Sequence, residues 1–116
     1  MDFADFEKNA AQWESRAQRV QGAAAQAMER LLRQAETSDS GQSHAIAHFI
    51  AATFDGHVFK FDPFDLRAVD IPVSDDMLAC LDALRWGRSD LHTLVPDGER
   101  RILAMCSARG LQWRDN

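Results

Sequence analysis

The chain has 116 residues and a formal net charge of −5, and 46% of its residues are hydrophobic. This length supports one hydrophobic core, so we expect a single domain over residues 1–116. The sequence has no apolar run near the ~20 residues of a membrane span, and its acidic total disfavours general nucleic-acid binding, which depends on neutralising phosphates.

The charge is unevenly distributed along the chain. Residues 37–84 carry two basic residues against eight aspartates, a net of −6, whereas residues 85–116 carry six arginines against four acidic residues, a net of +2. An acidic middle is suited to a basic protein surface. Trp86 and Trp113 lie among the C-terminal arginines, and this combination favours a protein interface over a nucleic-acid patch.

The first ten residues, MDFADFEKNA, have neither the basic start nor the apolar core of a signal peptide. Eleven arginines against two lysines suggest a bacterial genome rich in G and C. We therefore expect a cytoplasmic bacterial protein. In that compartment Cys80 and Cys106, which both fall on apolar stripes, are expected to be buried free thiols rather than a disulfide.

Residues 2–36 are predicted to form one long amphipathic helix. Its apolar residues recur with alternating spacings of three and four, the pattern of a heptad seam. A helix of this length spans about 50 Å, which exceeds a compact domain of this size, so residues 2–20 are expected to project or to pair. We predict that the chain self-associates as a homodimer through the first part of this seam. The residues concerned are Phe3, Phe6, Ala10, Trp13, Ala17 and Val20.

Residues 37–116 are predicted to fold into a compact helical core, which makes the whole chain an all-α bundle of four or five helices. Apolar residues recur at helical spacing in three segments, and a short helix opens at Asp62-Pro63. At most one short extended segment is expected, near residues 58–61. The predicted helices cover about residues 40–54, 63–69, 74–86 and 97–109.

Polar residues at the predicted helix starts match capping signals. Asp39 or Ser40 begins the first of these helices, and Asp39 with Gln42 fits a capping box. The segment 71–73 is expected to be extended because it contains the residue before a proline, so that Ser74 caps the next helix. The buried face of that helix is predicted to consist of Met77, Cys80, Leu81 and Leu84.

His44 and His48 are one helical turn apart, a spacing that can hold a metal ion. A zinc site needs a third ligand, and neither an HExxH motif nor a cysteine pair supplies one. Most of the aspartates are explained by helix capping and by the helix dipole. We therefore predict no catalytic residue, no metal and no cofactor. The residues predicted to contact a partner are Asp55, Asp70, Asp82, His44, His48, Arg85, Trp86 and Arg88.

Two segments, SGQSHAIAHFIAATF and FDPFDLRAVDIPVSDDML, resemble a known family. The shared elements are an SGQS helix start, an FDxxDL segment, a VD pair and a DDM helix start, found here at Ser40–Ser43, Phe61–Leu66, Val69-Asp70 and Asp75–Met77. On these motifs, residues 25–90 resemble a small family of unknown function carried on proteobacterial plasmids, integrative elements and prophages. The resemblance implies an accessory gene of a mobile element, and no catalytic residue carries over.

Three functions remain open from the sequence. The first is a non-enzymatic protein that binds a host or element-encoded protein, in one version as an inhibitor of a host defence complex similar to an anti-CRISPR protein. The second is a small dimeric regulator that contacts DNA through the arginines after residue 84. The third is a metal-dependent enzyme that uses His44, His48 and the aspartates. Because capping explains most of the polar residues, we expect the first.

Overall fold

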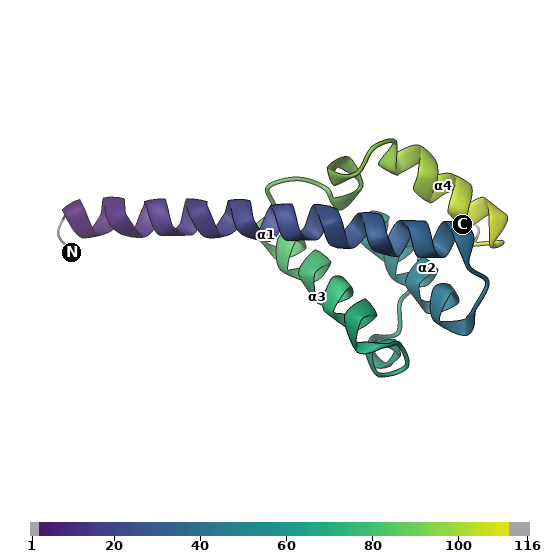
Figure 1. Cartoon of the computed structure of the whole chain (residues 1–116). Coiled ribbons are helices and arrows are strands. Elements are labelled where there is room, and N and C mark those ends of the chain that lie inside the picture. The colour runs from purple at the N-terminus through teal and green to yellow at the C-terminus, as the bar shows by residue number, and fades with distance from the viewer. Residues whose placement is uncertain (1–2, 112–116) are drawn as a thin grey trace.

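The computed structural model describes residues 3–111, which fold into helices and connecting loops (Figure 1). No strand forms among these residues, and the all-α bundle with a long N-terminal helix is confirmed. Trp113 and Arg114 lie outside the described residues. The elements are four α-helices and two 3₁₀ helices, in the order α1 (Phe3–Thr37), α2 (Gly41–Phe54), η1 (Pro63–Arg67), α3 (Ile71–Trp86), η2 (Leu91–Leu94) and α4 (Gly98–Ala108).

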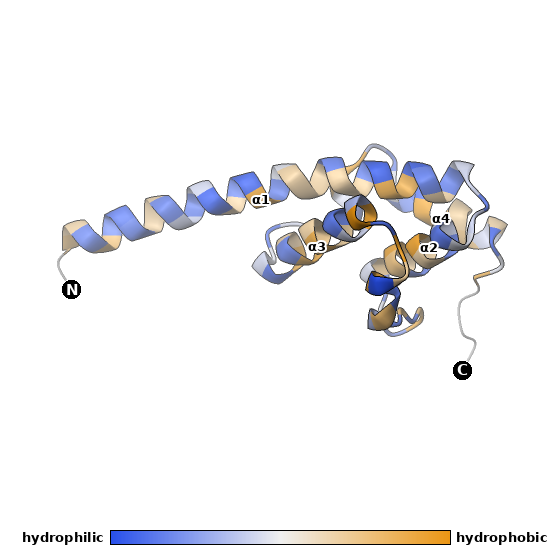
Figure 2. Ribbon diagram, turned by 60° about the horizontal axis from the view of Figure 1, so that its bottom comes forward, coloured by the Kyte–Doolittle hydropathy of each residue, from blue (hydrophilic) through white to orange (hydrophobic). Residues whose placement is uncertain are grey.

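The first part of α1 projects from the rest of the molecule. Residues 3–16, called the arm from here on, are exposed and extend away from the other helices in Figures 1 and 2. The radius of gyration is 16.1 Å, whereas a compact chain of this length has about 13 Å. The arm is shorter than the predicted projection of residues 2–20, because Ala17 already lies beside the end of α3.

The second part of α1 forms the centre of the core. It packs against α2, α3 and α4, and most extensively against α3. Its alanines permit close approach of the neighbouring helices, while larger side chains fill the space between them. Fully burying one aliphatic side chain stabilises the fold by about 1.5–3 kcal/mol. The largest fully buried apolar side chains are Phe49, Met28, Leu31, Leu32, Ile46, Ile50, Met77, Ile102 and Cys80.

The start of α2 differs from the predicted capping box of Asp39 and Gln42. Ser40 is the N-cap, because its side chain accepts a hydrogen bond from the Ser43 N–H at 3.1 Å. The buried Ser43 hydroxyl donates in return to the Ser40 carbonyl at 2.7 Å. The Gln42 side chain is used elsewhere: its carbonyl oxygen accepts from the Asp70 N–H at 2.6 Å. The polar start of α2 therefore also fixes the start of α3.

Helix α3 begins at Ile71 with Asp70 as its N-cap residue, so the predicted extended segment and the Ser74 cap are wrong. Pro72 occupies the second helical position, where a missing N–H costs nothing because no helical carbonyl precedes it. The Ser74 hydroxyl donates to the Ile71 carbonyl at 2.9 Å instead of capping. Pro72 therefore lies inside the first turn of the helix, and α3 begins three residues earlier than predicted.

The buried face of α3 also differs from the prediction. Met77 and Cys80 are buried as expected, but Leu81 and Leu84 are exposed. The remaining buried residues on α3 are Val73 and Ala83. Because α3 packs mainly on α1, only a narrow stripe of its surface is covered, and apolar side chains beside that stripe remain in solvent.

Two other helix ends follow their sequence signals. Asp62 caps η1 by accepting from the Phe64 N–H at 3.0 Å. After α4, Gly110 adopts the left-handed φ of +72°. The Leu111 N–H then donates to the Cys106 carbonyl at 2.8 Å, which completes a Schellman motif.

Gly98, the first residue of α4, is a glycine for steric reasons. It is buried, and a Cβ added there would overlap the backbone carbonyl oxygen of His92 and press on Val95. A carbonyl oxygen cannot rotate away as a side chain does, so the η2–α4 connection would have to shift. Gly22 in α1 is the opposite case, because an added Cβ meets nothing within 4 Å.

We expect Gly98→Ala to lower the free energy of unfolding by about 3 kcal/mol through this overlap. Gly22→Ala, the matched control, should raise it by about 0.5–1 kcal/mol because alanine favours the helix. Urea denaturation followed by circular dichroism measures both. A Gly98→Ala protein as stable as the wild type would contradict the close approach at η2.

Candidate functional site

The residues predicted to contact a partner fall in separate places. His44 and His48 lie on α2, and Asp55 caps the far end of that helix. Asp70 stands at the start of α3 and Arg85 near its end, about 22 Å apart along the helix axis. No single surface therefore contains the whole predicted set, and two surfaces emerge in its place.

The first surface lies where the arm meets the core, and we call it the root surface: Trp13, Arg16, Arg19, Arg85 and Trp86. The Trp13 and Trp86 rings lie with their centroids 5.6 Å apart at an interplanar angle of 55°. The Arg16 guanidinium carbon is 5.6 Å from the Trp13 centroid and 5.7 Å from the Trp86 centroid. Sequence reasoning placed Trp13 and Trp86 in different sites, because only the packing of α3 on α1 brings them together.

Two shallow hollows flank this cluster. One, of about 310 Å³, is lined by Trp13, Arg16, Arg85 and Trp86. The other, of about 530 Å³, is lined by Asn9, Gln12, Trp13, Arg16 and Arg19. Both are open to solvent along the arm, so they fit the side chains of another macromolecule better than an enclosed small ligand.

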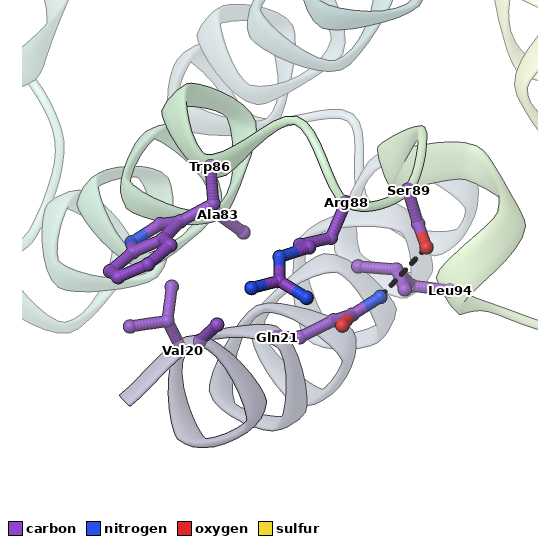
Figure 3. A pocket seen from close by; sticks show the side chains of 8 residues that line it. Val20, Gln21, Ala83, Trp86, Arg88, Ser89 and Leu94 are labelled. Carbon is purple, nitrogen blue, oxygen red and sulfur yellow. Dashed lines mark hydrogen bonds between the residues drawn. The ribbon is translucent and has the colours of Figure 1, made fainter. Parts of the chain in front are cut away.

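A smaller gap lies behind the root surface, between α1 and the end of α3 (Figure 3). Its volume of about 10 Å³ leaves space for a single water at most. The Gln21 amide closes it by donating to the Ser89 hydroxyl at 2.8 Å. Among residues 3–111, the Trp86 indole nitrogen is the one buried side-chain polar atom without a hydrogen-bond partner. We interpret this gap as imperfect packing rather than a binding pocket.

The second surface lies at the other end of α3, and we call it the acidic face: Asp62, Phe64, Asp70, Ile71, Asp75 and Leu78. Its three apolar side chains, Phe64, Ile71 and Leu78, are 68%, 72% and 52% exposed. Ile71 and Leu78 are seven residues apart and so share one side of α3. Three exposed carboxylates belong to the same part of the chain: Asp62 and Asp70 precede η1 and α3, and Asp75 lies in the first turns of α3. Sequence reasoning explained Asp62 and Asp75 by helix starts, assigned Asp70 to a partner contact, and missed the apolar residues, although the spacing of seven between Ile71 and Leu78 was readable.

The carboxylate of Asp76, next to Asp75 in the sequence, is bonded within the chain. Both of its oxygens accept from the Arg30 guanidinium, at 2.8 and 3.0 Å, and so tie α3 to α1. This interaction raises the pKa of Arg30 through the hydrogen bond to Asp76. Of the adjacent residues Asp75 and Asp76, only Asp75 therefore remains available to a partner.

The His44 and His48 rings form a pair on α2. Their Nε2 atoms are 3.1 Å apart and the ring centroids 4.5 Å apart, so one ring donates a hydrogen bond and the other accepts it. Burial lowers the pKa of His48, and the charge of a protonated His44 lowers it further. A backbone hydrogen bond to Lys60 and the Asp65 carboxylate act in the opposite direction. Within residues 3–111, no three His, Cys, Asp or Glu side chains are placed to hold a metal ion.

Cys80 and Cys106 are both free and buried, which confirms the prediction of unpaired thiols. Burial raises the pKa of Cys80 to about 12, and burial also raises the pKa of Cys106. Both thiols therefore stay protonated at neutral pH, and a protonated thiol is a poor nucleophile.

Most C-terminal arginines bond within the chain. Arg101 is the most enclosed, with a side chain 14% exposed, and it bonds Glu29 at 2.8 Å and Glu36 at 2.7 Å on α1. These hydrogen bonds raise the pKa of Arg101 and lower the pKa of Glu29. Arg109 donates to the carbonyls of Ala35 and Ser38, which caps the end of α1.

The residues that carry the sequence motifs connect α2, η1 and α3. Phe61 packs against Phe49 with ring centroids 5.2 Å apart, and Val69 and Met77 are buried. Together with the hydrogen bond from Asp70 to Gln42, these contacts fix the acidic face in position. The motifs therefore build a small all-α scaffold.

The sequence of residues 25–110 assigns the chain to a protein family. The model of a family of unknown function, DUF7673, matches residues 25–110, so the chain is a member of it. No curated protein and no solved structure matches the chain. The matched range covers the bundle from residue 25 onwards and leaves the arm and residues 17–24 outside. Within residues 3–111, none of the helices combines the length and the apolar character that a bilayer crossing needs.

We expect stability to depend on the protonation of His48. Its pKa in the folded state is below the unfolded value near 6.5, so the unfolded chain takes up the proton first as the pH falls. Stability is thus fully present above about pH 6.5 and is lost as the pH falls through the folded pKa. Between about pH 7.5 and pH 5, the unfolding free energy of His48→Gln should vary less than that of the wild type. His57→Gln, at an exposed position, is the control; equal pH dependence in wild type and His48→Gln would refute the assignment.

We expect Arg101 to stabilise the packing of α4 on α1. Arg101→Met keeps the aliphatic stem but leaves Glu36 without its partner and Glu29 with Arg33 alone, so it should lower the unfolding free energy by about 2–3 kcal/mol. Arg100→Met is the matched control, because Arg100 is exposed and pairs only with Asp97 at 3.2 Å. That exposed pair should be worth less than about 1 kcal/mol. Equal losses in the two variants, measured by urea denaturation, would show that Arg101 has no special role.

Proposed function

We propose that the protein acts without catalysis, by binding another protein through its acidic face. The observation that carries this proposal is the exposure of three large apolar side chains on η1 and α3, in a part of the chain that also exposes three carboxylates. Exposed apolar residues rimmed by polar ones are typical of protein interaction sites. Transfer of one such side chain from water is worth about 1.5–3 kcal/mol, and aromatic residues are frequent binding hot spots.

The charge of the face indicates a basic partner. Asp62, Asp70 and Asp75 are exposed, and residues 37–84 carry a net charge of −6. Such a field attracts a positively charged surface and repels nucleic acid. The guanidinium of Arg67 lies over the Phe64 ring, 5.4 Å from its centroid. The face therefore keeps its negative charge and combines it with an aromatic anchor.

The partner that fits this chemistry is a protein with a basic, nucleic-acid-binding groove. The resemblance of the sequence motifs to proteins of plasmids, integrative elements and prophages supports a role as an accessory protein of a bacterial mobile element. Occupying the groove of a host defence complex, as anti-CRISPR proteins do, would be one use of such a face. Binding to a protein encoded by the element itself would use the same contacts.

The contacts of the C-terminal arginines support a protein partner over DNA. Within residues 3–111 each of these arginines already bonds inside the chain, three of them as ion pairs with single carboxylates. A DNA-binding protein needs cations that are free to neutralise phosphates. The ion pairs are Arg85 with Asp82, Arg88 with Glu14, and Arg100 with Asp97, while Arg101 and Arg109 hold α4 to α1.

We expect a nuclease-treated host lysate to yield a basic protein on the immobilised wild-type chain, identified by mass spectrometry. Phe64→Ser combined with Ile71→Ser should reduce its recovery at least about tenfold, because both anchors are lost. Leu84→Ser, an exposed leucine near the other end of α3, is the matched control and should bind as the wild type does. Recovery should also fall as salt rises towards about 0.5 M.

Either of two results would contradict the proposal. One is equal recovery of every protein on the wild type and on the Phe64→Ser/Ile71→Ser variant. The other is recovery of a partner whose binding depends on the C-terminal arginines and disappears after nuclease treatment. The second result would favour the DNA-associated regulator.

A further inference from the structure

We propose that two copies of this chain associate through their arms in antiparallel orientation, so that the tip of each arm lies on the root surface of the other. This dimer uses residues distant from the acidic face and does not depend on the function proposed above. The arm is helical although no other helix covers it in either view (Figures 1 and 2).

The arm exposes one apolar stripe. Phe3, Phe6 and Trp13 are 74%, 60% and 55% exposed, and Ala10 lies between them on the same face. The stripe continues the face that the chain's own core buries from Ala17 onwards, and Val20 is half-buried there. Ala17 and Val20 are therefore unavailable to a second copy, and the predicted self-association narrows to the first four residues of the seam.

An uncovered helix of this length needs a partner. Helices shorter than about 12–15 residues are marginal in water, and most helical stability in proteins comes from packing of the apolar face. Residues 3–16 are held at one end only, by the continuation of α1 into the core and by the contacts of Trp13 with Trp86 and of Glu14 with Arg88. A second helix on the Phe3, Phe6 and Trp13 stripe would supply the packing that the chain itself does not.

The spacing of the stripe selects a second copy in reverse orientation. Residues 3, 6, 10 and 13 are symmetric about residue 8, so a reversed copy places Phe3 opposite Trp13 of the partner subunit and Phe6 opposite Ala10 of the partner subunit. At both central positions of the paired arms, the large Phe6 side chain of one copy then faces the small Ala10 side chain of the partner subunit. In parallel orientation Ala10 would face Ala10 of the partner subunit and leave a gap. The two Trp13 rings would also crowd a site where Trp86 already lies.

The charges favour the same orientation. The tip of the arm carries Asp5 and Glu7, whereas the root surface carries Arg16 and Arg19, which have no carboxylate partner within residues 3–111. Arg16 lies over the tryptophan rings, and Arg19 donates to the Ser15 hydroxyl at 2.8 Å. Antiparallel arms bring each acidic tip to a basic root, while parallel arms would place the two acidic tips side by side.

The root surface also has the space that the tip requires. The open hollow lined by Trp13, Arg16, Arg85 and Trp86 can receive the Phe3 ring of the partner subunit. Covering Phe3, Phe6 and Trp13 would bury roughly 400 Å² on each copy. Both copies together, with the flanking helix atoms, come to about 1,000 Å², the lower limit for a specific interface. The dimer is therefore reversible and depends on concentration.

Sedimentation equilibrium of the full chain over about three decades of concentration tests the proposal. We expect the mean mass to rise from that of one chain to that of two. Phe3→Ser combined with Phe6→Ser should raise the dissociation constant at least about tenfold. Neither ring contacts the chain's own core, so this variant keeps the fold, and Trp13→Ser provides a second test. Phe64→Ser/Ile71→Ser should dimerise like the wild type. A wild type that stays monomeric, or arm variants that dimerise unchanged, would overturn the proposal.

Cysteine cross-linking tests the orientation. Oxidation of a mixture of Phe6→Cys and Ala10→Cys chains should give mainly the mixed disulfide, because the two positions face each other only in antiparallel arms. The native thiols are buried and should not compete. Mass spectrometry distinguishes the products. A predominance of disulfides between identical positions would overturn the antiparallel arrangement.

Discussion

The close approach of α3 to the alanine-rich face of α1 is the contact on which the rest of the structure depends. Ala17, Ala24 and Ala27 are buried on α1, and their small side chains let α3 cross the long helix directly. Met28, Leu31 and Leu32 then fill the space towards α2 and α4. Because α1 supplies the centre of the core, the other helices need little contact with one another, and much of α3 remains in solvent.

This contact also decides where the two candidate surfaces lie. Helix α3 ends beside Trp13, so the apolar seam of α1 loses its cover at that point and continues bare to the tip of the arm. The other end of α3 carries Ile71 into solvent beside η1. One helix crossing therefore produces a basic aromatic surface at the root of the arm and an acidic apolar surface about 22 Å away along α3. The opposite charges of the two surfaces give them different partners.

Sequence patterns predicted the features that depend on residues close together in the chain. They missed the features that depend on how the helices pack on one another. Helical spacing gave the all-α class and the long first helix, and capping chemistry located η1 correctly. Leu81 and Leu84 were misassigned because periodicity identifies an apolar face of a helix without showing how much of it another helix covers. The start of α3 was missed because proline is accepted in a first turn, so its presence does not decide between a helix and an extended segment.

The candidate sites were harder to predict than the fold for the same reason. Trp13 and Trp86 are far apart in sequence, and no local signal connects them. The arginine-rich C-terminal region suggested a basic surface, but Arg101 and Arg109 turn inwards to bonds with α1 that only the fold supplies. The spacing of His44 and His48 is enough to place them on the same side of α2, whereas the acidic face required knowing that Ile71 and Leu78 stay exposed.

Helix α1 is one continuous helix with two environments, one made by its own chain and one left for another chain. Hydrogen–deuterium exchange along α1 distinguishes them, because amide protection reports local opening. We expect strong protection for residues 17–37 at every concentration. Residues 3–16 should exchange rapidly in the dilute protein, and their exchange should slow as the concentration rises. Uniform protection along α1 in the most dilute sample, or arm exchange that is independent of concentration, would contradict this division of α1.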